Sequence, residues 1–165
     1  MTDTATHVPV ILVDGSSYLY RAFFASQQAD LRNSEGFPTG AIRVVTSMLR
    51  SLLKQYPESP VMVVFDAKGK TFRNDMYDQY KANRPPAPED LVPQFPLTRD
   101  ATRAFNIACK EIEGFEADDI IATLACQARD AGGRCTIISS DKDLMQLVGD
   151  GVEMLDAMKN KRIDR

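Results

Sequence analysis

Acidic side chains in this sequence recur where apolar runs end or a helical pattern begins. Apolar strings end in aspartate at VILVD and MVVFD, a third string runs into SSDKD, and EADD opens a helical pattern. Seven carboxylates share this setting: Asp14, Asp66, Glu116, Asp118, Asp119, Asp141 and Asp143. The carboxyl ends of parallel strands meet at one edge of a sheet, so we expect these side chains to gather in one crevice.

Seven carboxylates in one crevice repel each other strongly unless cations neutralise them. Ligation by oxygen alone, without histidine or cysteine, favours Mg²⁺ or Mn²⁺ over zinc. Two such ions held about 4 Å apart form a site for phosphodiester hydrolysis. One ion activates a water that attacks phosphorus, and the other stabilises the leaving oxygen. The pattern therefore predicts a two-metal hydrolytic site.

Each carboxylate also has an ordinary structural explanation when it is taken alone. Asp14 precedes Gly15 and fits a turn, and Asp66 is unremarkable at a strand end. The acids of EADD fit a helix start, where they cap the backbone and favour the macrodipole. Asp141 fits the cap of a short helix over 143–148. The coincidence of all four groups at one predicted edge favours the metal site.

A basic segment follows Asp66 directly, although the chain as a whole carries a net charge of −3. The stretch 67–96 has neither helical nor strand periodicity, and we predict a non-core insertion there. Its basic and aromatic side chains suit phosphate tracking and base stacking, with a solvated mobile loop as the alternative. The residues expected to contact nucleic acid are Lys68, Lys70, Arg73, Tyr77, Tyr80, Lys81 and Arg84. Arg21, in a helix expected to start near Ser16 or Ser17, is a further candidate.

Strands and helices alternate along the predicted chain. Short runs rich in Val and Ile predict buried strands over 8–13, 61–65 and 135–138, with a further strand possible over 152–155. Amphipathic stripes predict helices over 39–56, 97–108 and 118–131. This order predicts an α/β fold whose mostly parallel central sheet is flanked by helices on both faces.

Other classes of protein are disfavoured by composition. No apolar run of transmembrane length and no signal-peptide pattern occurs, so we expect no membrane association. The lone histidine, His7, and three scattered cysteines argue against a zinc site or a disulfide framework. These features predict a reduced, cytoplasmic protein.

The strings VDGSSYLYRAFFA, GFPTGAI, VVFDAKGKTFRNDMYDQYKANRP, EGFEADDIIATLA and ISSDKDLMQLV resemble, in order and spacing, the 5′-nuclease domain of bacterial DNA polymerase I. This family belongs to the flap-endonuclease and PIN-like superfamily, with a resolvase-like sheet and a basic arch insertion, here at about 67–96. The resemblance implies that the chain is the N-terminal part of the catalytic domain. On this resemblance we expect a C-terminal helix–hairpin–helix part, and the polymerase domain of the same full-length chain, to lie outside residues 1–165.

The resemblance also implies roles for individual residues. Asp14, Asp66, Glu116 and Asp118, with Asp119 beside them, resemble ligands of a first metal ion. Asp141 and Asp143 resemble ligands of a second. Lys81 and Arg84 match arch residues that contact the scissile phosphate, and Arg21 resembles a phosphate-contacting position.

The implied activity is Mg²⁺-dependent removal of 5′ flaps and RNA primers from flapped or nicked DNA during replication and repair, with Mn²⁺ able to substitute. Alternatives remain open at this point. One is a nucleic-acid-binding module that is inactive as an isolated fragment, and another is a stand-alone PIN-type ribonuclease. The basic segment favours the structure-specific nuclease, since PIN-type domains lack the arch. A magnesium phosphatase is less favoured, because Asp14 is not followed by a second aspartate in a DxD pattern.

Overall fold

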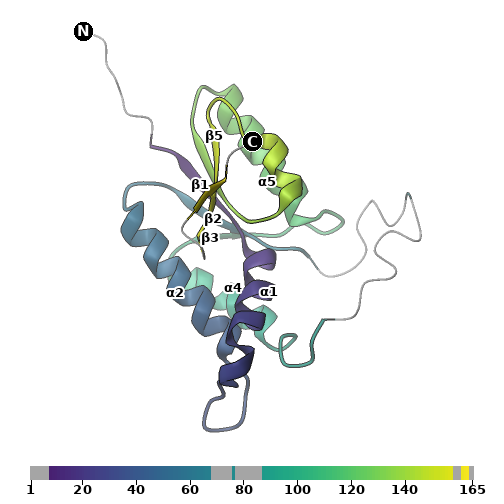
Figure 1. The fold of residues 1–165 in the computed structure, drawn as a ribbon. Coiled ribbons are helices and arrows are strands. Elements are labelled where there is room, and N and C mark those ends of the chain that lie inside the picture. Colours follow the sequence, from purple (N-terminus) through teal and green to yellow (C-terminus); the bar gives the residue numbers. More distant parts are fainter. Residues whose placement is uncertain (1–7, 68–75, 77–86, 158–160, 164–165) are drawn as a thin grey trace.

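The computed structural model describes residues 8–67, 76, 87–157 and 161–163. Within these ranges the chain forms three layers, a central sheet with helices on both faces (Figure 1). The strands are β1 (Val10–Asp14), β2 (Val61–Val64), β3 (Ala108–Lys110), β4 (Cys135–Ile138), β5 (Val152–Asp156) and β6 (Lys161–Ile163). Their order across the sheet is β3-β2-β1-β4-β5-β6. All neighbouring pairs are parallel except β5 with β6, so the predicted fold class is confirmed.

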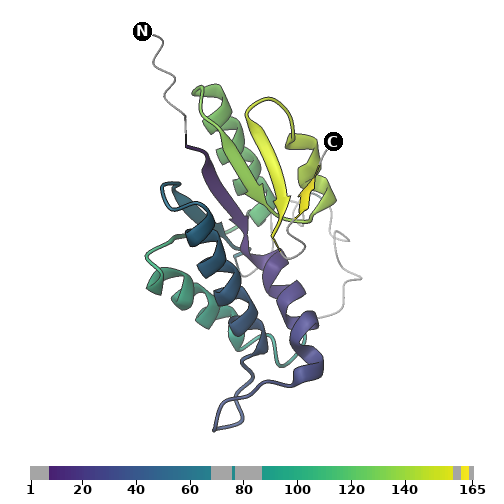
Figure 2. The same cartoon turned by 60° about the vertical axis from the view of Figure 1, so that its left-hand side comes forward.

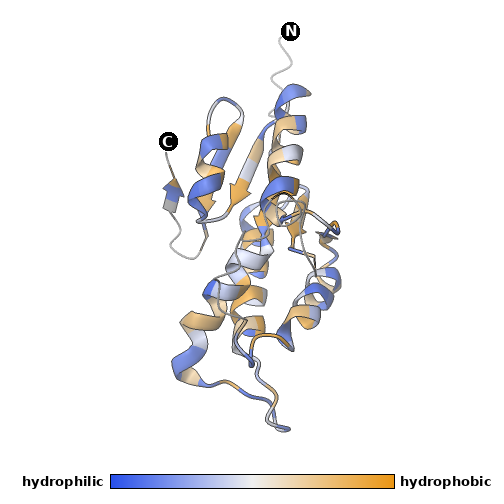
Figure 3. Cartoon of the chain, turned by 90° about the vertical axis from the view of Figure 1, so that its right-hand side faces the viewer, coloured by the Kyte–Doolittle hydropathy of each residue, from blue (hydrophilic) through white to orange (hydrophobic). Residues whose placement is uncertain are grey.

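The helices divide between the two faces of the sheet (Figure 2). They are α1 (Gly15–Ser26), α2 (Gly40–Gln55), α4 (Gln94–Ala104) and α5 (Ala117–Asp130), with short 3₁₀ helices η1 (Gln27–Ala29) and η2 (Lys142–Leu147). On β1, Ile11 and Val13 pack in the core under α1 and α2, whereas Leu12 packs in the core under α5. Figure 3 shows helices that alternate between hydrophobic and hydrophilic colours along their length. This is the pattern of helices that pack one apolar face against the sheet and expose the other. None of the helices in the described ranges is long and apolar enough to cross a bilayer.

The chain passes from β1 into α1 without a loop. Asp14 is both the last residue of β1 and the N-cap of α1, and its carboxylate accepts a hydrogen bond from the Ser17 N–H at 3.3 Å. Gly15 lies against β2: a Cβ at this position would sit 2.6 Å from the Phe65 ring and 2.7 Å from the Val63 side chain. Only glycine permits this approach, which brings the first turn of α1 beside the end of β2.

The end of the predicted insertion belongs to the core. Leu91 is fully buried, and α4 begins at Gln94, so the non-core segment ends earlier than the predicted residue 96. The buried Gln94 carboxamide accepts a hydrogen bond from the Ile42 N–H at 3.1 Å, and its amino group donates to the Asp90 carbonyl at 2.9 Å. It thereby satisfies an otherwise unpaired N–H in the first turn of α2.

Two expectations about individual elements need correction. The helix predicted over 97–108 occupies Gln94–Ala104 instead, and the chain then turns into β3 through Asn106, which has a φ of 60°. β3 and β6 were not predicted, because each is a three-residue edge strand that carries too little alternation to stand out. The strand expected over 152–155 is present and extends to Asp156.

Gly15→Ala is expected to destabilise the fold by about 1–3 kcal/mol, because the added methyl group overpacks against Phe65 and Val63. The free energy of unfolding in urea measures this. Gly149→Ala is the matched control, since its Cβ would meet nothing within 4 Å. Equal effects of the two substitutions would contradict the close-approach explanation.

Candidate metal centre

Three carboxylates converge at the carboxyl edge of the sheet. Asp14, Asp118 and Asp141 each offer a carboxylate oxygen, and these oxygens all lie within 4.8 Å of one another. Asp14 ends β1, Asp141 follows β4, and Asp118 stands in the first turn of α5. Because β1 and β4 are parallel neighbours, their carboxyl ends meet at the same edge of the sheet.

A buried serine hydroxyl joins two members of this cluster. Ser139 is fully buried, and its Oγ donates to Asp14 Oδ2 at 3.0 Å while accepting from the Asp141 N–H at 3.0 Å. Ser139 therefore sets the spacing between the end of β1 and the segment after β4. The sequence gave no signal for this bridging role.

The electrostatics of the cluster show the cost of crowding these acids. Burial, the largest cause, raises the pKa of Asp14 from 3.8 to about 6, and repulsion from Asp66 and Asp141 adds to it. The hydrogen bonds from Ser17 and Ser139 act in the opposite direction. Burial followed by repulsion from Asp14 and Asp141 raises the pKa of Asp118 to about 8. A divalent cation placed among these groups would relieve both effects.

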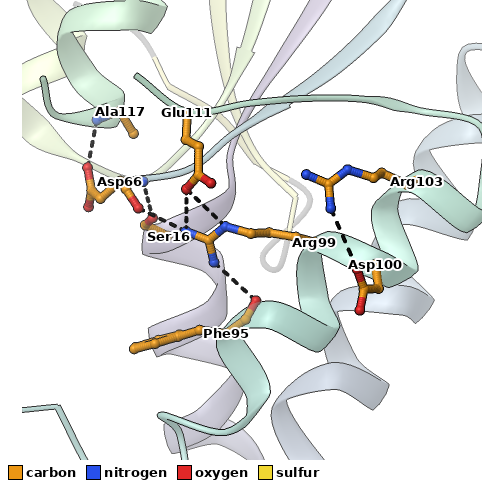
Figure 4. A network of polar contacts seen from close by, with 8 residues as sticks. All are labelled: Ser16, Asp66, Phe95, Arg99, Asp100, Arg103, Glu111 and Ala117. Atoms are coloured by element: carbon orange, nitrogen blue, oxygen red, sulfur yellow. Dashed lines mark hydrogen bonds and ion pairs between the residues drawn. The ribbon is translucent and has the colours of Figure 1, made fainter. Parts of the chain in front are cut away.

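Asp66 borders the cluster and is held by its backbone and its side chain. It lies two residues beyond β2, is exposed, and donates its N–H to Ser16 Oγ at 2.8 Å. Its carboxylate accepts from the Ala117 N–H in the first turn of α5 at 2.6 Å (Figure 4). Asp66 is near enough to raise the pKa of both Asp14 and Asp118. Ser16 and Ala117 were not among the predicted site residues.

Glu116 and Asp119 form a capping box at the start of α5. The Glu116 side chain accepts from the Asp119 N–H, and the Asp119 carboxylate accepts from the Glu116 N–H at 3.1 Å. In the described part of the chain, neither belongs to the group of three acids that lie within 4.8 Å of one another. Their assignment as metal ligands stays a prediction.

Of the pair predicted for a second metal ion, only Asp141 lies in the cluster. Asp141 caps η2 by accepting from the Asp143 N–H at 2.9 Å, as one interpretation of the sequence had it, while Asp143 itself is exposed. Across the described residues the structure therefore gathers three of the seven acids tightly and leaves Asp143 outside that group.

Arg21 is held by an acid that the sequence analysis did not select. Its Nη1 pairs with Asp156 Oδ1 at 3.0 Å, and its guanidinium lies 5.5 Å from the centroid of the Tyr18 ring. Tyr18 Oη donates to Asp156 at 3.4 Å and accepts from the Ala157 N–H at 2.7 Å. Asp156 was not predicted as a site residue, because the strand was expected to end at Leu155. A phosphate contact by Arg21 stays a prediction.

The basic and aromatic residues predicted to contact nucleic acid lie outside the described residues. They are Lys68, Lys70, Arg73, Tyr77, Tyr80, Lys81 and Arg84.

A mostly parallel sheet that brings three carboxylates together at its carboxyl edge is an α/β arrangement that could hold a divalent cation. The sequence profile of the 5′-3′ exonuclease N-terminal resolvase-like domain matches residues 9–165. The chain belongs to this family, which confirms the resemblance seen in its motifs.

Relatives of known name agree with this assignment. The chain is 52% identical over 161 residues to DNA polymerase I of Rhizobium leguminosarum, covering 93% of this chain and 16% of the polymerase. It is 42% identical over 150 residues to a 5′-3′ exonuclease of Aquifex aeolicus, covering 91% of this chain and 51% of that protein. The chain thus spans a small part of the polymerase and about half of the exonuclease.

Solved structures show the same fold. The 5′-exonuclease of bacteriophage T5 with bound zinc ions superposes with a TM-score of 0.71 at 22% identity, over 94% of this chain and 58% of that one. A T5 flap endonuclease in complex with DNA and metal ions superposes with a TM-score of 0.68 at 25% identity, over 94% and 57% of the two chains.

Metal-free thermal stability is expected to fall as the pH rises from about 5 to about 9, and Mg²⁺ is expected to offset the fall. Asp14 and Asp118 bind protons more tightly in the folded chain, with pKa values raised to about 6 and about 8. Their contribution to stability is complete below their ordinary pKa of 3.8 and is lost as the pH rises through the raised values.

Thermal unfolding across this pH range, with Asp118→Asn as the comparison, measures the effect. The asparagine variant is expected to lose less stability with rising pH and to gain less from Mg²⁺. An unchanged pH slope in that variant would contradict the assignment.

Ser139→Ala is expected to weaken Mn²⁺ binding by about 10-fold or more, the usual cost of losing a residue that orients a ligand. The variant loses the hydroxyl donor to Asp14 and leaves the Asp141 N–H without that acceptor. Calorimetric titration of the metal-free chain measures the affinity. Ser140→Ala is the neighbouring control, and an equal loss there would argue against a specific bridge.

Proposed function

We propose that this chain is the catalytic part of a divalent-metal-dependent nuclease that hydrolyses DNA phosphodiesters near a 5′ end. The observation that carries the proposal is the convergence of Asp14, Asp118 and Asp141 within 4.8 Å at the carboxyl edge of the sheet. Support comes from the name of the Aquifex relative and from the T5 flap endonuclease complex with DNA and metal ions.

The donor set fits hard divalent cations. Carboxylate oxygens alone, with no imidazole or thiolate within the cluster, favour Mg²⁺, with Mn²⁺ as a substitute. The raised pKa values of Asp14 and Asp118 support the fit, because a cation is the group that would let both acids ionise together at neutral pH. We propose Asp66 as a further ligand of this first ion. A second ion would be held by Asp141 with Asp143.

Bound divalent cations would supply an activated water and stabilise charge on the leaving oxygen. The residues of the chain act by orientation. Ser17 and Ser139 donate hydrogen bonds that fix both oxygens of Asp14. The Ala117 N–H fixes the carboxylate of Asp66. Such preorganisation lowers the cost of assembling the site when the substrate arrives.

The substrate side of the proposal rests on basic residues. Lys81 and Arg84 would contact the scissile phosphate, and Arg21, anchored by Asp156 at 3.0 Å, would face a neighbouring phosphate. The substrates we propose are DNA with a 5′ flap, a nick or an RNA primer. The relatives named DNA polymerase I support a setting in which this domain acts beside a polymerase domain in the bacterial cytoplasm.

Cleavage of 5′-labelled flap DNA by the chain, with Mg²⁺, with Mn²⁺ and with chelator, tests the proposal. We expect metal-dependent cutting near the flap junction. Asp14→Asn and Asp66→Ala are expected to slow it by about 100-fold or more, since each removes a proposed ligand of the cation that stabilises charge on the leaving oxygen.

Asp150→Asn, which changes an exposed acid in the turn before β5, is the matched control and should cut normally. A chain that binds flap DNA but does not cut it under any metal condition, even when extended at its C-terminus, would support the binding-module alternative instead.

A further inference from the structure

The backbone of Asp66 leaves the sheet at the edge of the metal centre. The last ladder contact before it is the Phe65 N–H, which donates to the Lys110 carbonyl at 2.9 Å. Beyond this point Asp66 depends on three separate hydrogen bonds. The Asp66 N–H donates to the Ser16 hydroxyl, and the Asp66 carboxylate accepts from the Ala117 N–H. The Asp66 carbonyl accepts from Arg99 Nη2 at 2.9 Å.

Arg99 is itself held from several sides, as Figure 4 shows. Its Nε and Nη2 both donate to Glu111 Oε2, at 3.1 Å and 2.9 Å, and its Nη1 donates to the Phe95 carbonyl at 3.1 Å. The guanidinium carbon lies 4.7 Å from the centroid of the Phe65 ring. The side chain is only 15% exposed. A planar guanidinium group with this many partners has little freedom to move. It therefore offers the Asp66 carbonyl a hydrogen-bond donor in a fixed position.

The surroundings of Arg99 do not suit a phosphate ligand. The adjoining cavity, of about 540 Å³, is lined by Ala67, Phe95, Pro96, Arg99, Glu111 and Glu113. Glu111 already neutralises the guanidinium, and Glu113 adds a further negative charge. Arg99 therefore orients Asp66 through a hydrogen bond, while its own positive charge is neutralised and does not compete with a cation.

We infer that Arg99 is a positioning residue for Asp66, and that Glu111 fixes Arg99 in turn. Arg99 acts through the main-chain carbonyl and so sets the direction in which the Asp66 carboxylate leaves the backbone. The inference rests on the proposed function, because it assigns Asp66 to the metal centre. It predicts that loss of Arg99 lowers the affinity of the folded chain for divalent cations.

Binding of Mn²⁺ to the metal-free chain, without DNA, tests the inference by calorimetric titration or by electron paramagnetic resonance of the free ion. Arg99→Gln is expected to weaken binding by about 10-fold or more, as other residues that orient metal ligands do. Glu111→Gln is expected to weaken Mn²⁺ binding as well, because Arg99 loses the carboxylate that orients it and neutralises its positive charge. Arg99→Lys should restore part of the affinity through a single donor.

Arg103→Gln is the matched control. Arg103 lies one turn further along α4 and pairs with Asp100 at 3.5 Å, with both side chains more than half exposed (Figure 4). Its loss should leave Mn²⁺ affinity unchanged. Thermal unfolding of each metal-free variant shows whether the chain is folded at the temperature of the titration.

The possible outcomes separate the two proposals. Wild-type chain that binds no Mn²⁺ would overturn the proposed function and this inference together. Wild-type chain that binds, with Arg99→Gln and Glu111→Gln equally tight, would overturn this inference alone. A lower unfolding temperature with unchanged affinity would mean that Arg99 only braces α4. If Arg99→Gln does not fold, Arg99→Lys and Glu111→Gln decide the question.

Discussion

Repulsion between carboxylates that the fold brings together is the constraint on which the rest of the site depends. Asp14 is buried at the end of β1, and Asp118 and Asp141 approach it from other elements. Such an arrangement is unfavourable without compensation: burial first, and then repulsion between the acids, raise the pKa values of Asp14 and Asp118. The sheet, α1 and α5 must therefore hold these groups in place against their own electrostatics.

The compensation comes largely from neutral donors. Backbone N–H groups at the starts of α1 and α5 point at Asp14 and Asp66, where the positive end of each helix favours negative charge. The hydroxyls of Ser16 and Ser139 complete the set, one bonding the backbone of an acid and the other a carboxylate. Neutral donors orient carboxylates without neutralising them, so the acids keep their capacity to bind a cation.

The sequence predicted the central sheet and the convergence of acids for a simple physical reason. Strands buried on both faces appear as continuous Val and Ile runs, and the ends of parallel strands share an edge. Edge strands β3 and β6 lack such runs, so they were missed. Whether Glu116 and Asp119 cap α5 or bind metal depends on side-chain direction, which their types and spacing cannot distinguish. Asp156, Ser139 and Arg99 act through tertiary contacts between distant segments, and no local pattern marks them.

The order of the strands has a consequence for how the chain assembles. β1 stands between β2 and β3 on one side and β4, β5 and β6 on the other, so the early and late parts of the chain join along β1 and β4. Asp14 belongs to the early part, whereas Asp118 and Asp141 belong to the late part. A cation held by all three would link the two parts of the sheet, since neither part alone offers all three carboxylates. Binding of such a cation would therefore stabilise the complete sheet relative to either part alone.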